Sequence, residues 1–85
     1  MSESISSRQL KAALAMLRWS VADLAKASGV SEPTIWRLES EDGPLGGKPE
    51  TAEKLITALE AGGVVFVDEK DGGPGVYLPK GKRRR

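Results

Sequence analysis

The sequence of 85 residues predicts a small, mainly α-helical domain that ends in a two-stranded β-hairpin. Two stretches, 10–17 and 52–59, place apolar residues at i, i+3, i+4 and i+7, which indicates helices with one buried face. Between them, residues 20–39 hold two short helical patterns joined at a glycine. Near the C-terminus, two runs of β-branched and aromatic residues flank a glycine- and proline-rich turn, which is typical of a hairpin.

The first helix is expected to begin directly after a flexible N-terminus of residues 1–6. Ser6 and Gln9 have the spacing of a capping box, in which each residue bonds the backbone of the other. The helix then buries one apolar stripe, made by Leu10, Ala13, Leu14 and Leu17.

The central stretch, residues 20–39, repeats one device for starting a helix. Ser20 and Ser31 are each suited to cap a helix N-terminus, and Asp23 completes a capping box with Ser20. Gly29 is placed where the first of these helices must stop in a left-handed conformation. An apolar residue before each cap pairs with one five positions later as a hydrophobic staple, in the pairs Trp19–Leu24 and Val30–Ile35. Two short helices joined in this way indicate a helix-turn-helix.

Residues 24–39, LAKASGVSEPTIWRLE, resemble the helix-turn-helix of the lambda-repressor and Cro-like family of bacterial transcription regulators. The resemblance extends, with less specificity, over residues 7–62. It implies a helix-turn-helix DNA-binding domain over 7–62, a bundle of four to five helices whose third helix enters the DNA major groove. One departure is Val21, where the family often carries a glutamine that contacts the DNA backbone. The matching residues are Leu24, Ala25, Gly29, Val30, Ser31, Ile35, Leu38 and Glu39.

The resemblance implies that helix 31–40 reads bases with the side chains that the core does not use. Arg37 can make two hydrogen bonds to a guanine edge, and Thr34 can place its methyl group against a thymine. Glu32 can accept from a cytosine amino group or simply favour the helix start. Trp36 either lies against a sugar or thymine or covers the following loop. The expected base-reading set is Glu32, Pro33, Thr34, Trp36 and Arg37.

Phosphate contacts are expected from two helix starts, one loop and a basic disordered tail over residues 80–85. Residues 1–79 hold eight basic and twelve acidic residues, a net charge of −4 that opposes binding to a polyanion. The tail adds five cations and reverses that sign. The expected phosphate-contacting set is Ser20, Ser31, Lys48, Lys80, Lys82, Arg83, Arg84 and Arg85.

Residues 63–79 are expected to form the hairpin, with strands at 64–67 and 75–78. A lone two-stranded hairpin is marginally stable in water, so it must pack on the helices or pair with another copy. Symmetric half-sites on DNA also call for a two-fold dimer. We therefore expect a homodimer whose interface is made by Val65, Phe66, Val67, Val76, Tyr77 and Leu78.

The residue inventory argues against an enzyme. The chain has no histidine and no cysteine, and its carboxylates and lysines form no catalytic or calcium-binding motif, so no cofactor or metal is expected. No apolar run approaches a membrane span, and the N-terminus lacks the features of a signal peptide. We expect a cytoplasmic bacterial protein that does not bind a membrane and takes no dedicated small-molecule effector.

The sequence thus predicts a DNA-binding transcription regulator, a homodimeric repressor whose partner is double-stranded DNA. The alternative is a protein-interaction module of the same fold, an antitoxin or anti-repressor, which the acidic body of the chain favours. The operator and the regulated genes cannot be read from the sequence.

Overall fold

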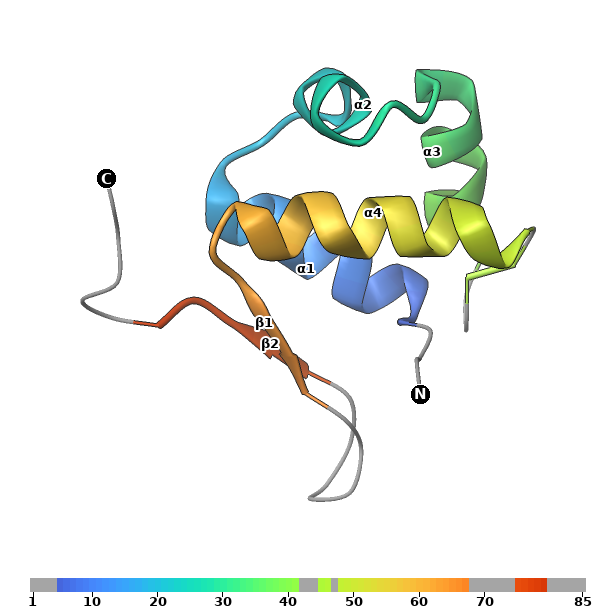
Figure 1. The fold of residues 1–85 in the computed structure, drawn as a ribbon. Helices are drawn as coiled ribbons and strands as arrows, with labels where there is room; N and C mark the ends of the chain where they lie inside the picture. Colours follow the sequence, from blue (N-terminus) through green and yellow to red (C-terminus); the bar gives the residue numbers. More distant parts are fainter. Residues whose placement is uncertain (1–4, 42–44, 47, 68–74, 80–85) are drawn as a thin grey trace.

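The computed structural model describes residues 5–41, 45–46, 48–67 and 75–79. These residues form a small, mainly helical fold with a two-stranded antiparallel hairpin, as the sequence predicts. In Figure 1, α2 lies above α1 and α4, α3 stands at one end of α4, and the hairpin lies below the helices. The elements are α1 (Ser7–Leu17), α2 (Val21–Ser28), α3 (Glu32–Ser40), α4 (Pro49–Ala61), β1 (Val65–Val67) and β2 (Gly75–Tyr77).

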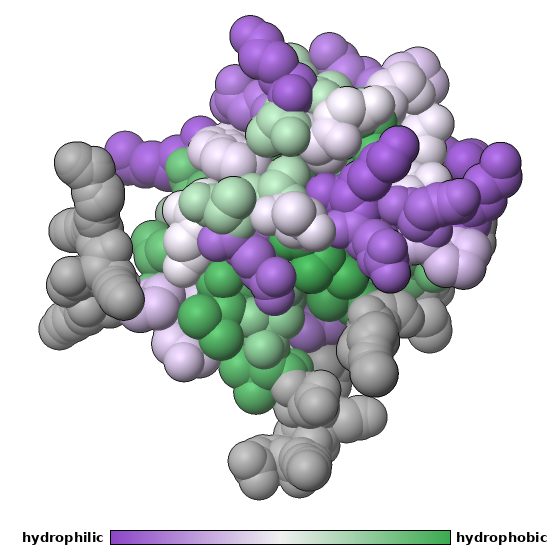
Figure 2. Space-filling view, viewed as in Figure 1, coloured by the Kyte–Doolittle hydropathy of each residue, from purple (hydrophilic) through white to green (hydrophobic). Residues whose placement is uncertain are grey.

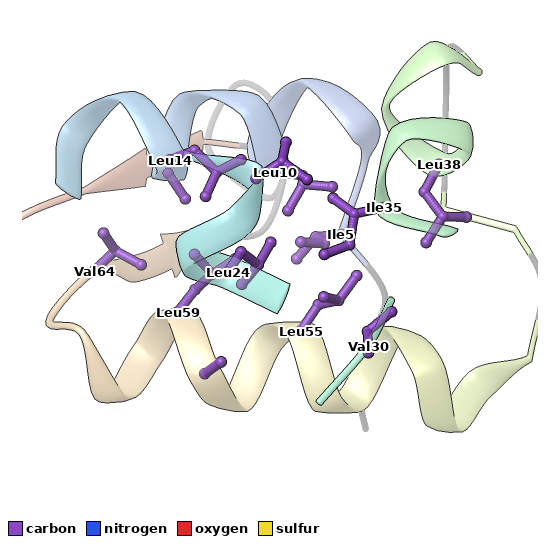
Figure 3. Close-up of a cluster of buried hydrophobic side chains, with 13 residues drawn as sticks. Ile5, Leu10, Leu14, Leu24, Val30, Ile35, Leu38, Leu55, Leu59 and Val64 are labelled. Carbon is purple, nitrogen blue, oxygen red and sulfur yellow. The ribbon is translucent and has the colours of Figure 1, made fainter. Parts of the chain in front are cut away.

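A single hydrophobic core joins the four helices. Leu10, Leu24, Ile35 and Leu55, one from each helix, are fully buried in it. Figure 3 shows these side chains meeting in the space between α1 and α4. The predicted capping boxes Ser6–Gln9 and Ser20–Asp23 are both present, so the starts of α1 and α2 are confirmed.

The N-terminal segment is more ordered than the sequence analysis expects. Ile5 is only 5% exposed, and its carbonyl oxygen accepts a hydrogen bond of 3.0 Å from the Leu45 amide. Ile5 precedes the Ser6 cap and lies five residues before Leu10, which is the same staple spacing found at the other two caps. The expectation of a flexible N-terminus over 1–6 is therefore wrong for residues 5 and 6, and residues 1–4 lie outside the described part of the chain.

The hairpin packs on the helices through one of its two faces. Phe66 and Val76 are partners in the antiparallel register, and both are partly buried against the core. Gln9 of α1 fastens the hairpin, because its Nε2 donates to the Gly75 carbonyl at 2.9 Å and to the Val67 carbonyl at 3.4 Å. The sequence predicts Gln9 only as a capping residue.

The helices and the hairpin share one hydrophobic core. The boundary that the sequence analysis places between the helical segment 7–62 and the hairpin 63–79 therefore does not divide the core. Val64, just before β1, is 3% exposed and belongs to the main cluster. Gly62 lies so close to the α1–α2 connection that an added Cβ would be 2.9 Å from Leu17 Cδ1 and 3.0 Å from Trp19 Cζ2. Removing residues 63–85 would therefore expose part of the core as well as remove the hairpin.

Arg18 ends α1 in the left-handed conformation, with φ of 59°, at a position where glycine would be less strained. Replacing Arg18 by glycine is therefore expected to raise the free energy of unfolding by about 0.5–1 kcal/mol. Gly29 at φ of 80° has no atom within 4 Å of an added Cβ. Gly29→Ala thus serves as the opposite control and should cost about 1 kcal/mol through backbone strain alone. Urea unfolding of both variants measures these shifts, and a destabilised Arg18→Gly protein would contradict the prediction.

Candidate nucleic-acid interface

The α2–turn–α3 segment begins at a fully formed cap. The Ser20 hydroxyl accepts from the Asp23 amide at 3.0 Å, and Asp23 Oδ2 accepts from the Ser20 amide at 2.9 Å. The helix ends at Gly29, which has the left-handed conformation that the sequence predicts. The Ser20 N–H already donates to the Asp23 carboxylate, whose negative charge also repels an anion. Ser20 can therefore offer an incoming phosphate only its hydroxyl proton.

Ser28 holds the turn between α2 and α3, and the sequence analysis does not identify this role. Its Oγ donates to the Leu24 carbonyl at 2.7 Å and accepts from the Val30 amide at 3.1 Å. The signal in the sequence is a serine directly before the glycine that ends a helix, where a hydroxyl can reach back one turn. The two bonds link the last turn of α2 to Val30, a core residue that is 8% exposed.

The start of α3 is capped by Ser31. Its Oγ accepts from the Thr34 amide at 3.4 Å and donates to Thr34 Oγ1 at 2.9 Å. Pro33 lies in the first turn of α3, where backbone N–H groups have no acceptor within the helix, so its lack of an N–H costs no helical hydrogen bond. Since Thr34 Oγ1 accepts the Ser31 proton, the Thr34 hydroxyl keeps its own proton for an outside acceptor, whereas Ser31 is committed to the cap.

Helix α3 has one buried side and one exposed side. Ile35 is 0% exposed and Leu38 is 2% exposed, as predicted. Figure 3 shows Ile35 pointing from α3 into the core. The five expected base-reading residues lie on the rest of the helix surface, with Thr34 half-buried and Glu32, Pro33, Trp36 and Arg37 exposed.

Trp36 is the most exposed of the large apolar side chains in the described part of the chain, at 57%. The loop after α3 lies largely outside the described residues, so the covering role of Trp36 stays a prediction. Arg37 stands next to it in the sequence and is also exposed. The outward side of α3 therefore offers a flat aromatic surface and a guanidinium fork together.

Among the remaining phosphate-contacting candidates, only Lys48 lies in the described residues. Lys48 occupies the N-cap position of α4, where it is exposed and makes no side-chain capping bond. The loop that leads to it is tied to the N-terminal segment by the Leu45–Ile5 backbone bond. The tail residues Lys80, Lys82, Arg83, Arg84 and Arg85 lie outside the described part of the chain.

The described residues hold only part of the charge that opposes DNA binding. The described residues carry seven basic side chains, all exposed, and seven acidic ones, so their net charge is zero. The acidic excess of residues 1–79 belongs to Glu3, Asp42 and the segment 68–71, which lie outside the described residues. Residues 1–79 as a whole keep their net charge of −4, which opposes binding to a duplex.

Comparison of the chain with protein-family models gives no match, and comparison with curated proteins finds none that is similar. Within the described residues, no three or more acidic side chains are grouped so that they could hold a metal ion. None of the helices α1 to α4 is both long and apolar enough to cross a membrane.

Proposed function

We propose that the chain is a sequence-specific DNA-binding regulator of transcription, acting as a repressor that reads the major groove with α3. The observation that carries this proposal is the division of α3 into a side that buries Ile35 and Leu38 and a side that exposes Trp36 and Arg37. A short helix held by its apolar side and preceded by a second capped helix is the arrangement that presents side chains to a groove.

Each exposed residue of α3 has a definite part in this proposal. Arg37 reads a guanine through its fork, and Thr34 uses its free hydroxyl proton or its methyl group. Trp36 packs its ring against a sugar or a thymine methyl group. Lys48 and the Ser20 hydroxyl contact phosphates, which orients α3 without adding sequence information.

The alternative, a protein-interaction module, is favoured by one specific observation. Tryptophan and arginine are also the residue types that dominate the energetics of protein–protein interfaces, and Trp36 and Arg37 are exposed side by side in the sequence. Selection of binding sites from random DNA, followed by mobility shifts at two salt concentrations, separates the two functions. A DNA reader should enrich one sequence and bind it at least about 10³-fold more tightly than random DNA. Failure to enrich any sequence would support the protein-binding alternative.

Arg37→Ala should cost about 1–3 kcal/mol on the selected site and relax the preference at one base position. Binding to random DNA should change little, because base reading contributes nothing there. Arg37→Lys is the matched control, since it keeps the positive charge but lacks the two-pronged guanidinium. Titration of both variants on both kinds of DNA measures the effect. If lysine restored full affinity, or if alanine weakened all sequences equally, Arg37 would be a phosphate contact.

A further inference from the structure

Two neighbouring residues of α3 face outward together, between two that are buried in the core. Ile35 and Leu38 are buried, whereas Trp36 is 57% exposed and Arg37 is exposed as well. Successive residues of a helix point about 100° apart, so Trp36 and Arg37 lie on the two sides of one outward ridge. Figure 2 shows hydrophobic residues gathered over the hairpin, below the more polar surface of the helices, so α3 lies apart from this apolar area.

The turn before α3 and the first turn of α3 are both fixed by hydrogen bonds. Ser28 Oγ donates to the Leu24 carbonyl and accepts from the Val30 amide, which joins the last turn of α2 to the segment that leads into α3. Ser31 then caps α3 through Thr34. The helix therefore has a set position on the core. Its exposed side chains can be aimed at particular atoms of a base, as the narrow geometry of a hydrogen bond requires.

The chemistry of the Trp36 side chain matches one base better than the other three. An indole offers a flat apolar ring and one N–H donor, and it has no acceptor. When an indole is buried, its N–H needs an acceptor, because an unpaired donor is costly. In the major groove, thymine alone presents an apolar group beside an acceptor, its C5-methyl group and O4. Cytosine presents an amino donor there, and the two purines carry no methyl group.

We propose that Trp36 recognises a thymine in the base pair next to the guanine that Arg37 reads, an inference that rests on the proposed function. The ring packs on the thymine methyl group, and the indole N–H donates to O4. Successive Cα atoms are about 3.8 Å apart and stacked bases about 3.4 Å apart, so neighbouring residues of one helix can reach neighbouring base pairs. A tryptophan placed on a sugar would instead add affinity without any preference between bases.

Base analogues within the selected site test the two contacts separately and need only the wild-type chain. Replacing the thymine by uracil removes the methyl group alone and should weaken binding about fourfold. Replacing the T·A pair by a 5-methylcytosine·G pair keeps the methyl group but puts a donor in place of O4. This second change should weaken binding at least about fivefold. Fluorescence-anisotropy titration of the full chain on the three duplexes measures both losses.

Three variants of α3 assign the two preferences to one side chain. Trp36→Phe keeps an apolar ring without the N–H, so it should still prefer thymine to uracil but lose most of its preference for thymine over 5-methylcytosine. Trp36→Ala should lose both preferences. Thr34→Ser is the matched control, because it keeps the hydroxyl and removes the only other methyl group among the expected base-reading residues. Both preferences should be unchanged in Thr34→Ser.

The thymine contact is overturned if uracil binds as tightly as thymine, or if Thr34→Ser rather than Trp36→Ala abolishes the preference for thymine. It is also overturned if the selected site has no thymine next to the guanine whose preference is lost in Arg37→Ala. Each of these outcomes leaves the proposed function standing, because the chain still selects a DNA sequence. A chain that selects no sequence would overturn the proposed function and the thymine contact together.

Discussion

Ile35→Ala is expected to lower the free energy of unfolding by about 2–5 kcal/mol, because it removes a fully buried side chain and leaves a cavity. A domain of 85 residues has only a few kcal/mol of stability in total, so this loss should unfold a large part of the population. Ile35 also anchors α3 to the core, and DNA binding should fall with the folded fraction.

Trp36→Ala is the matched control on the same helix. It removes a larger side chain from the next position, but the tryptophan is 57% exposed and leaves no internal cavity. Its effect on stability should stay within about 0.5 kcal/mol, while binding to the selected DNA site should weaken. Thermal unfolding and DNA titration of both variants would separate the two roles. Equal destabilisation by both substitutions would show that Trp36 is a core residue and would remove it from the interface.

Removal of residues 80–85 should produce the largest change in DNA affinity. Each phosphate that a cation neutralises contributes about 0.9 to the slope of log affinity against log salt. Each chain loses five cations, so the slope should flatten by several units, and all DNA sequences should be weakened similarly. The remaining chain has a net charge of −4.

Replacing the same six residues by glycine and serine keeps the length of the tail and removes only its charge, so it should behave like the deletion. Affinity is measured on the selected site and on random DNA over a range of salt concentrations. An unchanged slope would show that the tail does not contact phosphates. Lys48 and the exposed basic residues of the helices would then have to supply the electrostatic attraction.

The sequence by itself determined where the helices begin and which side of each is buried. The starts of α1, α2 and α3 depend on capping bonds between residues three positions apart, such as the Ser20–Asp23 capping box. The two residues of the predicted Val30–Ile35 staple are both buried in the core. Contacts of this kind form within one or two helical turns, so their residues can be recognised from spacing alone. The buried residues of α3, Ile35 and Leu38, follow from the same periodicity.

The tertiary structure alone decided how distant segments are joined. Gln9 bonds carbonyls that lie 58 and 66 residues further along the chain, and Ile5 bonds Leu45 in the loop before α4. The tertiary structure also decided which side of the hairpin faces the core. Side chains alternate along β1, which places Phe66 on one face and Val65 and Val67 on the other, but this alternation does not show which face the helices cover. Such contacts depend on how the helices pack in space, and no local spacing encodes them.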